Sequence, residues 1–384
     1  MPGTFPDRLT IGFPGAVTPP FSGVTKYAQR IEALGGEAMW YPDHLMGFWP
    51  ESAWTPDVTP LAAVLRSPHT YLDPFIAIAG AATSTSTIKL GTAVTQVLGR
   101  HPAHLAQLFL SLSHLSGGRV ILGIGAGEGE NLTPYGIPYE RPAARVAEAL
   151  QIIRLLWEHE EPVSFDGEFW PLRDAVLALM PDSQAPAPPI WLAAAGPAML
   201  KTAGRYADGW LPFGVPSPQD YRRGLAVIEQ AAKEAGRSMK GFVPALWAYT
   251  VIHEHAEDAE RILDSPLVKG VCLMLGSEAF QRRGFEHPLG PGFQGWRDYI
   301  PTRIGREQAL AAMRRIPLEV AREFVLAGTP ESVTARLREL EEAGLRHAVL
   351  WNVTFFADTK LVGPSYELMA NLPFVRRKQA VNAD

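Results

Sequence analysis

Residues 101–131 read HPAHLAQLFLSLSHLSGGRVILGIGAGEGEN, and this stretch contains one repeat of the predicted fold. Its first half has apolar residues at helical spacing, and its second half, RVILGIGAG, is a short run that is apolar at nearly every residue. A strand of this kind is covered on both faces, as parallel strands with helical crossovers are. The stretch therefore predicts a helix packed against a buried parallel strand.

The same alternation of short apolar runs and helical segments continues toward both ends of the chain. It predicts eight strands, which begin near Leu9, Ala38, Ile88, Arg119, Pro189, Gly209, Phe242 and His347. Either a closed barrel or an open doubly wound sheet could hold them. We favour the barrel because strand after strand ends in polar or small residues, where barrel active sites lie. The predicted fold class is α/β, a (β/α)8 TIM barrel.

Three segments do not fit the repeat. They lie near residues 47–67, 160–188 and 276–303, and the first is rich in Trp and Pro. Barrels with insertions often run past 250 residues as one unit, so we expect a single domain over residues 1–384. Long insertions in such a fold usually shape the substrate pocket.

The composition excludes several classes of partner. The formal charge is −5 and the pI is near 6.1, with no basic cluster, so we expect no nucleic acid partner. The start MPGTFPDRLT has no basic segment followed by an apolar one, and no apolar run approaches the roughly 20 residues of a membrane span. We expect a cytoplasmic protein. Cys272, in the run VCLML, is expected in the core.

Asp43 and His44 stand at the end of the second predicted strand. A carboxylate beside an imidazole suits proton transfer, because histidine titrates near neutrality and the carboxylate can orient a partner. A capping Asp with a surface His would explain the pair better if it stood alone.

A glycine-rich loop follows the fourth strand, GIGAGEGEN from Gly123, and it ends in Glu128, Glu130 and Asn131. It is not a dinucleotide-binding loop, because Glu128 breaks the G-x-G-x-x-G spacing and no helix with a ribose-binding acid follows at the expected distance. Glycines required only for a tight turn explain the loop about as well as ligand binding does.

The fifth strand ends in Ala194, Ala195, Gly196 and Pro197. Proline at a first helical position leaves backbone N–H groups pointing outward, and such a helix start can hold phosphate. Close packing of strand and helix would require the same small residues.

No metal site is predicted. His101 and His104 have a possible spacing, but no Cys, Asp or Glu accompanies them, and a helix cap at the surface explains them better. The chain also lacks a G-x-S-x-G elbow and a Walker loop, which leaves hydrolases and kinases without their residues.

Together these segments resemble the luciferase-like oxidoreductase family, specifically its branch that uses the deazaflavin coenzyme F420. The resemblance runs over nearly the whole chain. Four segments carry it: WYPDHL from 40, IKLGTAVT from 88, residues 101–131, and PIWLAAAGPAMLKTAGRYADGWLP from 189. Within this branch the chain is similar to the mycobacterial phthiodiolone ketoreductases in GRYADGWLP, FEHPLGPGFQGWRDYIP from 285 and VLAGTPESV from 325.

The resemblance implies roles for the residues above. Asp43 would contact the deazaflavin, and His44 would transfer a proton beside its central ring. Glu128 matches a catalytic acid. Ala93 and Val94 would form a non-prolyl cis peptide against one ring face.

The rest of the cofactor groove also follows from the resemblance. Asn131 and residues 194–197 would form its walls and phosphate end. Trp49 is the third catalytic candidate, although it falls one place late and Phe48 takes the ungapped position. The family's usual assembly implies a homodimer.

These assignments predict hydride transfer between F420 and a ketone or alcohol, with His44 or Glu128 supplying the proton. The aromatic residues Phe48, Trp49, Trp54, Phe293 and Trp296 favour a hydrophobic small-molecule substrate, although barrel-rim packing explains them nearly as well. Two alternatives stay open: an FMN-dependent monooxygenase of the same superfamily, and a non-catalytic barrel that binds a flavin.

Overall fold

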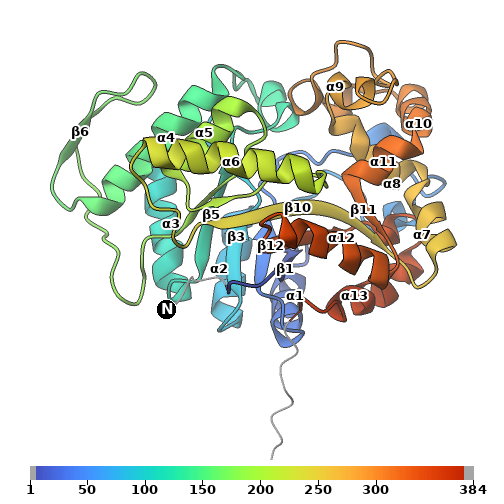
Figure 1. Cartoon of the computed structure of the whole chain (residues 1–384), viewed down its shortest axis with the longest axis horizontal. Helices are drawn as coiled ribbons and strands as arrows, with labels where there is room; N and C mark the ends of the chain where they lie inside the picture. The colour runs from blue at the N-terminus through green and yellow to red at the C-terminus, as the bar shows by residue number, and fades with distance from the viewer. Residues whose placement is uncertain (1–5, 376–384) are drawn as a thin grey trace, which may run out of the picture.

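The computed structural model describes residues 6–375, so the N-terminal segment discussed above begins outside the described residues (Figure 1). Within them, eight parallel strands close into a barrel, with β12 pairing β1 and β10 pairing β9. The predicted fold class and all eight predicted strands are confirmed. In chain order the barrel strands are β1 (Thr10–Pro14), β2 (Ala38–Tyr41), β3 (Lys89–Thr92), β5 (Val120–Gly125), β8 (Ile190–Leu192), β9 (Gly209–Trp210), β10 (Val243–Ile252) and β12 (His347–Asn352).

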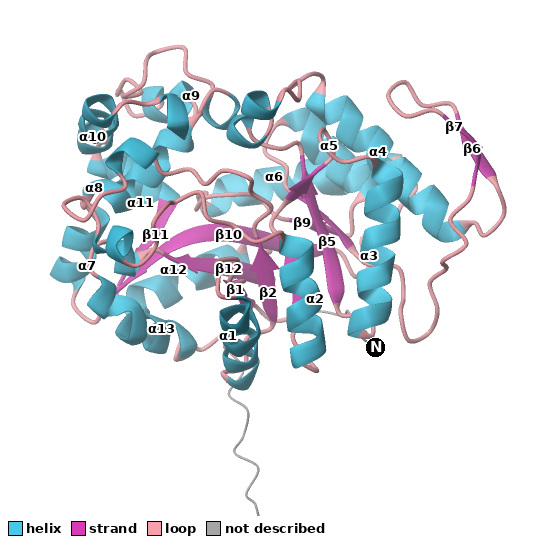
Figure 2. Cartoon of the chain, turned by 180° about the vertical axis from the view of Figure 1, so that it is seen from behind, coloured by secondary structure: helices cyan, strands magenta, loops and turns pink. Residues whose placement is uncertain are grey.

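The main helices surround this barrel (Figure 2). Several begin with proline at the first helical position, where its fixed φ suits the helix and its missing N–H costs nothing. Asp73 caps one of them by accepting from the backbone N–H of Phe75 at 2.9 Å. The outer helices are α1 (Phe21–Ala33), α2 (Pro74–Ser84), α3 (Pro102–Ser116), α4 (Pro142–Glu158), α5 (Pro197–Tyr206), α6 (Pro218–Glu234), α12 (Pro330–Glu342) and α13 (Val362–Ala370).

Large side chains fill the inside of the barrel. The Trp40 and Trp191 rings lie 4.8 Å apart, and Trp40 Nε1 donates to His347 Nε2 at 2.9 Å. Glycine is needed beside them: a Cβ on Gly123 would lie 1.7 Å from the Thr92 carbonyl oxygen. The barrel is therefore a packed core and not a pore, and a ligand must bind at its end.

Segments between the barrel strands carry elements outside the strand–helix repeat. The segment 160–188 carries a projecting hairpin, β6 (Val163–Phe165) with β7 (Leu172–Ala175) (Figure 2). Between β10 and β12 the insertion begins well before residue 276. Its unpredicted elements are α7 (Ala256–Leu263), α8 (Pro266–Lys269), α10 (Arg306–Arg315), α11 (Leu318–Phe324) and β11 (Val325–Gly328), which pairs with the second half of β10.

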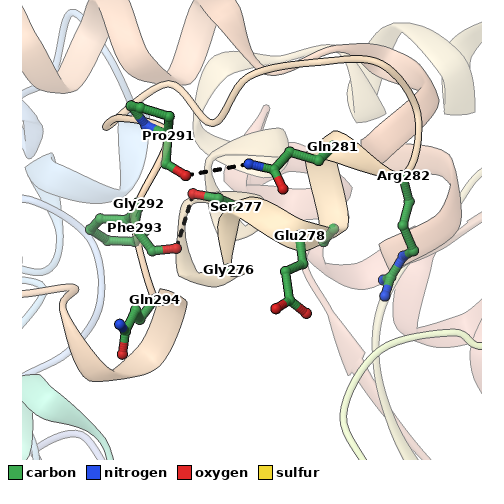
Figure 3. A pocket seen from close by; sticks show the side chains of 10 residues that line it. Gly276, Ser277, Glu278, Gln281, Arg282, Pro291, Gly292, Phe293 and Gln294 are labelled. Carbon is green, nitrogen blue, oxygen red and sulfur yellow. Dashed lines mark hydrogen bonds between the residues drawn. The ribbon is translucent and has the colours of Figure 1, made fainter.

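The first and last insertions share a hydrophobic cluster, which also includes Tyr249 and Val251 of β10. It joins Trp49 and Trp54 of the first insertion to Cys272 and Phe280 of the last, and burial raises the pKa of the Cys272 thiol. The core position predicted for Cys272 is confirmed. A hollow of about 630 Å³ opens beside α9 (Ser277–Gln281), where the Ser277 hydroxyl donates to the Phe293 carbonyl oxygen at 3.0 Å (Figure 3). Phe293, one of the aromatic residues predicted for the substrate side, lines it, and none of the predicted catalytic or cofactor-binding residues does.

No helix within residues 6–375 combines the length and apolar character that crossing a membrane requires.

Candidate active site

Asp43 follows β2 at the C-terminal end of the barrel and is held from two sides. Arg100 donates to both carboxylate oxygens at 2.9 and 3.0 Å, and the Thr95 hydroxyl donates at 2.6 Å. The guanidinium also lies 4.7 Å from the centre of the Phe75 ring. The Asp43 side chain is only 8% exposed, so this pairing compensates a charge that burial would otherwise penalise.

Replacing Arg100 with alanine is expected to lower the free energy of unfolding by about 1 to 2 kcal/mol. The loss stays below that of a fully buried pair because the Arg100 side chain is 32% exposed. Chemical denaturation would measure it. The matched control is Arg141→Ala, which breaks the exposed pair with Glu168 and should change nothing measurable. Equal losses in the two variants would contradict a special role for the Asp43 pair.

The next residue, His44, is fixed by an amide from another strand end. Asn131 Oδ1 accepts from the backbone N–H groups of Leu45 at 2.7 Å and Met46 at 3.0 Å. These bonds fix the orientation of the amide, so its nitrogen donates to His44 Nδ1 at 2.7 Å. In neutral His44 the proton is therefore on Nε2.

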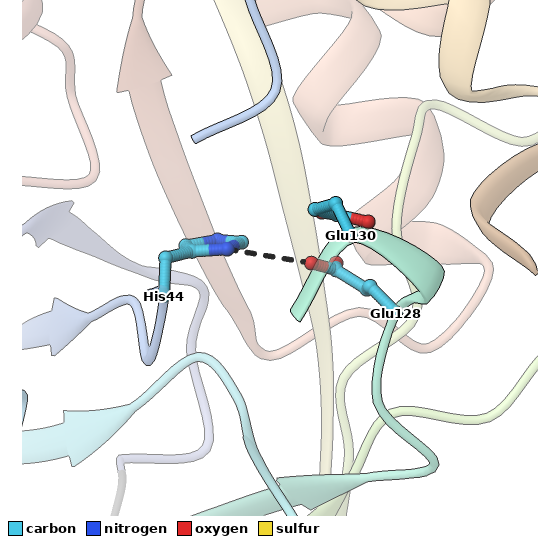
Figure 4. A group of neighbouring side chains, drawn as sticks. All are labelled: His44, Glu128 and Glu130. Carbon is cyan, nitrogen blue, oxygen red and sulfur yellow. Dashed lines mark ion pairs between the residues drawn. The ribbon is translucent and has the colours of Figure 1, made fainter. Parts of the chain in front are cut away.

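Glu128 and Glu130 complete this cluster (Figure 4). The Asn131 amide nitrogen lies 3.4 Å from Glu128 Oε2 and 3.5 Å from Glu130 Oε1, and His44 Nδ1 lies 3.5 Å from Glu128 Oε2. The Asn131 amide N–H group thus lies among acceptor atoms of His44, Glu128 and Glu130, which are within 4.8 Å of one another. The sequence reasoning noted Glu130 in the loop but gave it no role.

Glu130 is the most unusual group of the cluster. Its side chain is fully buried, and its Oε2 has no hydrogen-bond partner within the described chain. Burial, followed by the neighbouring Glu128 carboxylate, raises the pKa of Glu130 well above its ordinary value.

Aromatic rings border the His44 imidazole. The Phe48 ring lies 5.8 Å away edge-on, and the Tyr71 ring lies 5.4 Å away. Phe48 in turn touches Tyr249 and Trp351 from β10 and β12, at 5.9 and 6.3 Å. Sequence reasoning missed Tyr71, because it lies in a loop without a motif.

Trp49 is not brought to His44. Its ring stacks on Phe356 at 4.5 Å, and its Nε1 donates to the Leu267 carbonyl oxygen at 3.2 Å. Phe48, at the ungapped position, is the residue that borders the imidazole. A catalytic role for Trp49 stays a prediction without support from this geometry.

The peptide bond between Ala93 and Val94 is cis, as predicted. It lies against the end of β5, where a Cβ on Gly125 would come 2.9 Å from Val94 Cγ2. The Ala93 N–H donates to the Tyr41 carbonyl oxygen at 2.8 Å, which ties the bond to β2. Contact of these two residues with a cofactor stays a prediction.

The start of α5 lies at the end of β8. Ala194 is buried, and its carbonyl oxygen accepts from Trp210 Nε1 at 2.8 Å. Ala195, Gly196 and Pro197 are exposed, and no side chain caps this helix. Its first N–H groups and the helix dipole suit an anionic group.

The helix-cap reading of His101 is confirmed. It precedes α3, and its Nδ1 accepts from the backbone N–H of Ala103 at 3.1 Å. His104 is exposed on the first turn of the same helix.

A closed parallel barrel whose strand ends gather an imidazole, two carboxyl groups and a fixed amide is the arrangement of a TIM-barrel enzyme. The model of the luciferase-like monooxygenase family matches residues 7–347, and the chain belongs to this family. The predicted family is thereby confirmed.

Two groups of curated relatives are similar in sequence. The phthiodiolone/phenolphthiodiolone dimycocerosates ketoreductase of Mycobacterium tuberculosis is 36% identical over 352 residues, covering 90% of this chain and 92% of the relative. The 5,10-methylenetetrahydromethanopterin reductase of Archaeoglobus fulgidus is 30% identical over 271 residues, covering 70% of this chain and 78% of the relative.

Two solved structures share the fold at low sequence identity. An F420-dependent secondary alcohol dehydrogenase in complex with an F420-acetone adduct is 22% identical, with a TM-score of 0.73, and covers 96% of this chain and 99% of its own. The coenzyme F420-dependent tetrahydromethanopterin reductase of Methanopyrus kandleri is 23% identical, also with a TM-score of 0.73, and covers 96% and 100%.

Proposed function

We propose that this protein is an F420-dependent oxidoreductase that transfers a hydride between the deazaflavin and a ketone or alcohol. The observation that carries the proposal is the cluster of His44, Asn131, Glu128 and Glu130 at the mouth of the barrel. It places proton-carrying groups on rigid strand ends, which reduction of a carbonyl requires. The ketoreductase relatives at 36% identity support this reaction class.

The residues present fit the cofactor. F420 carries an anionic phosphate tail, and the exposed, uncapped start of α5 offers free N–H groups and a positive dipole end for it. The Ala93–Val94 segment and Asp43 lie at neighbouring strand ends and would border the ring. An enzyme of the same fold holds an F420-acetone adduct in its solved structure, and a second enzyme of this fold is F420-dependent. When bound, reduced F420 supplies the hydride.

The chain itself holds and moves the proton. His44 or Glu128 gives a proton to the carbonyl oxygen as that oxygen gains negative charge. Asn131 keeps the imidazole in one orientation, and Arg100 keeps Asp43 in place. Phe48 and Tyr71 limit the access of water to His44.

The substrate side of the site is apolar. Trp351 and Trp247 lie 4.8 Å apart, Tyr249 and Phe213 lie 5.3 Å apart, and Trp296 reaches Phe213 from the last insertion at 5.0 Å. Such a wall favours a hydrophobic ketone or alcohol. Trp54 and Phe293 instead pack within the insertions, as Trp49 does.

A binding titration tests the cofactor. Oxidised F420 and FMN are titrated into the purified protein at the same salt concentration, and fluorescence is followed. We expect saturable binding of F420 and much weaker binding of FMN. A preference for FMN would move the protein to the monooxygenases of the family, and F420 binding without turnover on any ketone or alcohol would make it a non-catalytic carrier.

We propose a homodimer in the cytoplasm on the strength of the family resemblance. Light scattering after gel filtration tests the assembly, and fractionation of the producing cells tests the location.

A further inference from the structure

We propose that Glu130 and Glu128 share one proton at neutral pH, and that Glu130 thereby acts as a positioning residue that keeps an acidic proton available at Glu128. The kinetic part of this proposal rests on the proposed function. The protonation itself is a property of the chain without cofactor.

The geometry carries the proposal. The two carboxyl groups belong to one short turn, η3 (Gly129–Asn131), and its preceding residue, and their oxygens lie within 4.8 Å. Glu130 is fully buried, whereas the Glu128 side chain is 29% exposed. Two carboxylates this close cannot both ionise readily when one of them is out of water.

The surroundings offer little to stabilise a second negative charge. The Asn131 amide is the side-chain donor between the carboxyl groups, but its nitrogen is 3.4 and 3.5 Å from them and already donates to His44. The backbone N–H of Glu130 lowers the pKa of its own carboxyl group, but burial and Glu128 outweigh it. Among residues 6–375, Glu130 Oε2 has no hydrogen-bond partner. A proton on that oxygen would satisfy it and remove the repulsion.

The other titratable groups around the pair are His44 and four tyrosines. The tyrosines come from separate elements, and they are Tyr71, Tyr139, Tyr249 and Tyr299. Burial raises the pKa of each one. Both glutamates add to this rise for the first three, and Glu130 alone adds to it for Tyr299. The tyrosines stay neutral at physiological pH and cannot balance the charge of the pair. Arg297 also faces this shell and lowers the pKa of Tyr139, against the effect of burial and the glutamates.

The shared proton gives the reaction a complete balance. With a ketone bound, reduced F420 would supply the hydride, one of its C–H bonds breaking as the new C–H bond forms, and the carbonyl π pair would move to oxygen. An O–H bond of the carboxyl pair would break as its proton forms the O–H bond of the alcohol, directly or through His44. The pair is left as two carboxylates, which draw a proton back from solvent through the exposed edge of Glu128. In the oxidative direction the pair receives the proton.

The first test needs no cofactor. A raised pKa means that the folded chain holds a proton that the unfolded chain releases, so this stability is present at low pH and lost as pH rises above the ordinary glutamate pKa. Glu130→Gln keeps the shape of the side chain and removes this loss of stability at higher pH. We expect the Tm of the variant to exceed that of the parent by several degrees at pH 8 and by much less at pH 5. The control Glu140→Gln, at an exposed site, should follow the parent at both values.

The second test is the pH dependence of kcat with F420 and a reducible ketone. Glu130→Gln removes one of the two carboxyl groups that share the proton, so the alkaline fall in kcat should move by more than one pH unit toward acid in this variant and not in Glu140→Gln. A purely structural role would lower kcat evenly across the profile.

The outcomes separate the two proposals. If the Tm difference between parent and Glu130→Gln grows with pH but the protein shows no turnover with F420, the shared proton is supported and the proposed function is contradicted. Equal pH dependence of Tm in parent and Glu130→Gln would overturn the shared proton even in an active enzyme. A divalent cation that raises the Tm of the parent and not of Glu130→Gln would also overturn it, because an ion would then take the proton's place.

Discussion

Replacing His44 with alanine is expected to lower kcat by about 10² to 10⁴ while the affinity for F420 stays nearly unchanged. The imidazole is held by Asn131 at 2.7 Å and bordered by Phe48 and Tyr71, so its place is fixed before substrate arrives. Removing it takes away a positioned proton donor. The predicted phosphate end of the groove, at α5, is not touched.

Steady-state kinetics and a fluorescence titration of the same samples separate these effects. His159→Ala serves as the control, because His159 is exposed at the end of α4. Unchanged kcat in His44→Ala would remove His44 from the reaction. A parallel loss of kcat and of F420 affinity would show instead that the variant had damaged the groove.

Acid is expected to destabilise the protein through His347. Burial, with a smaller contribution from Lys89, lowers the pKa of His347 to about 3 from an ordinary 6.5. Trp40 Nε1 donates to its Nε2, so the neutral ring donates from Nδ1 to Thr10 Oγ1 at 2.8 Å, and a second ring proton would face the indole N–H.

The direction of this pH effect on stability follows from proton uptake. Below pH 6.5 the unfolded chain binds a proton at this position and the folded chain does not, so stability is complete above pH 6.5 and falls toward pH 3. The loss amounts to roughly 4 kcal/mol. Burial also lowers the pKa of His287, to about 4, so His287 adds to the loss of stability in acid.

Denaturation curves of the parent and of His347→Gln across this range isolate the contribution. The variant should be less stable at neutral pH, because it loses ring packing, but its stability should fall less steeply with acid. His159→Gln should keep the slope of the parent. Identical slopes for the parent and His347→Gln would contradict the assignment.

Local patterns in the sequence were sufficient to predict the barrel. Each barrel strand is a short apolar run before small or polar residues, and two of the predicted strand ends bring His44 and Asn131 into contact. The cis peptide at Ala93 followed from the family resemblance. Pattern and resemblance therefore locate residues that belong to strand ends.

The remainder depends on contacts between distant segments. Arg100 reaches Asp43 from 57 residues away, and Tyr71 reaches His44 from an irregular loop. The sequence GEGEN does not reveal that Glu130 is buried, because its acids alternate with glycine as solvent-exposed acids in a loop would. β11 was missed because it extends one side of β10 outside the closed barrel.

The bonds that Asn131 Oδ1 accepts from the loop after β2 come from the backbone N–H groups of Leu45 and Met46, and the amide nitrogen reaches only the His44 side chain of that loop. The Leu45 side chain stands outside this network and is 59% exposed, although it directly follows His44. Position 45 can therefore accept many side chains without disturbing the proton-carrying groups. Evolution or an engineer can therefore vary a surface side chain one residue away from the chemistry.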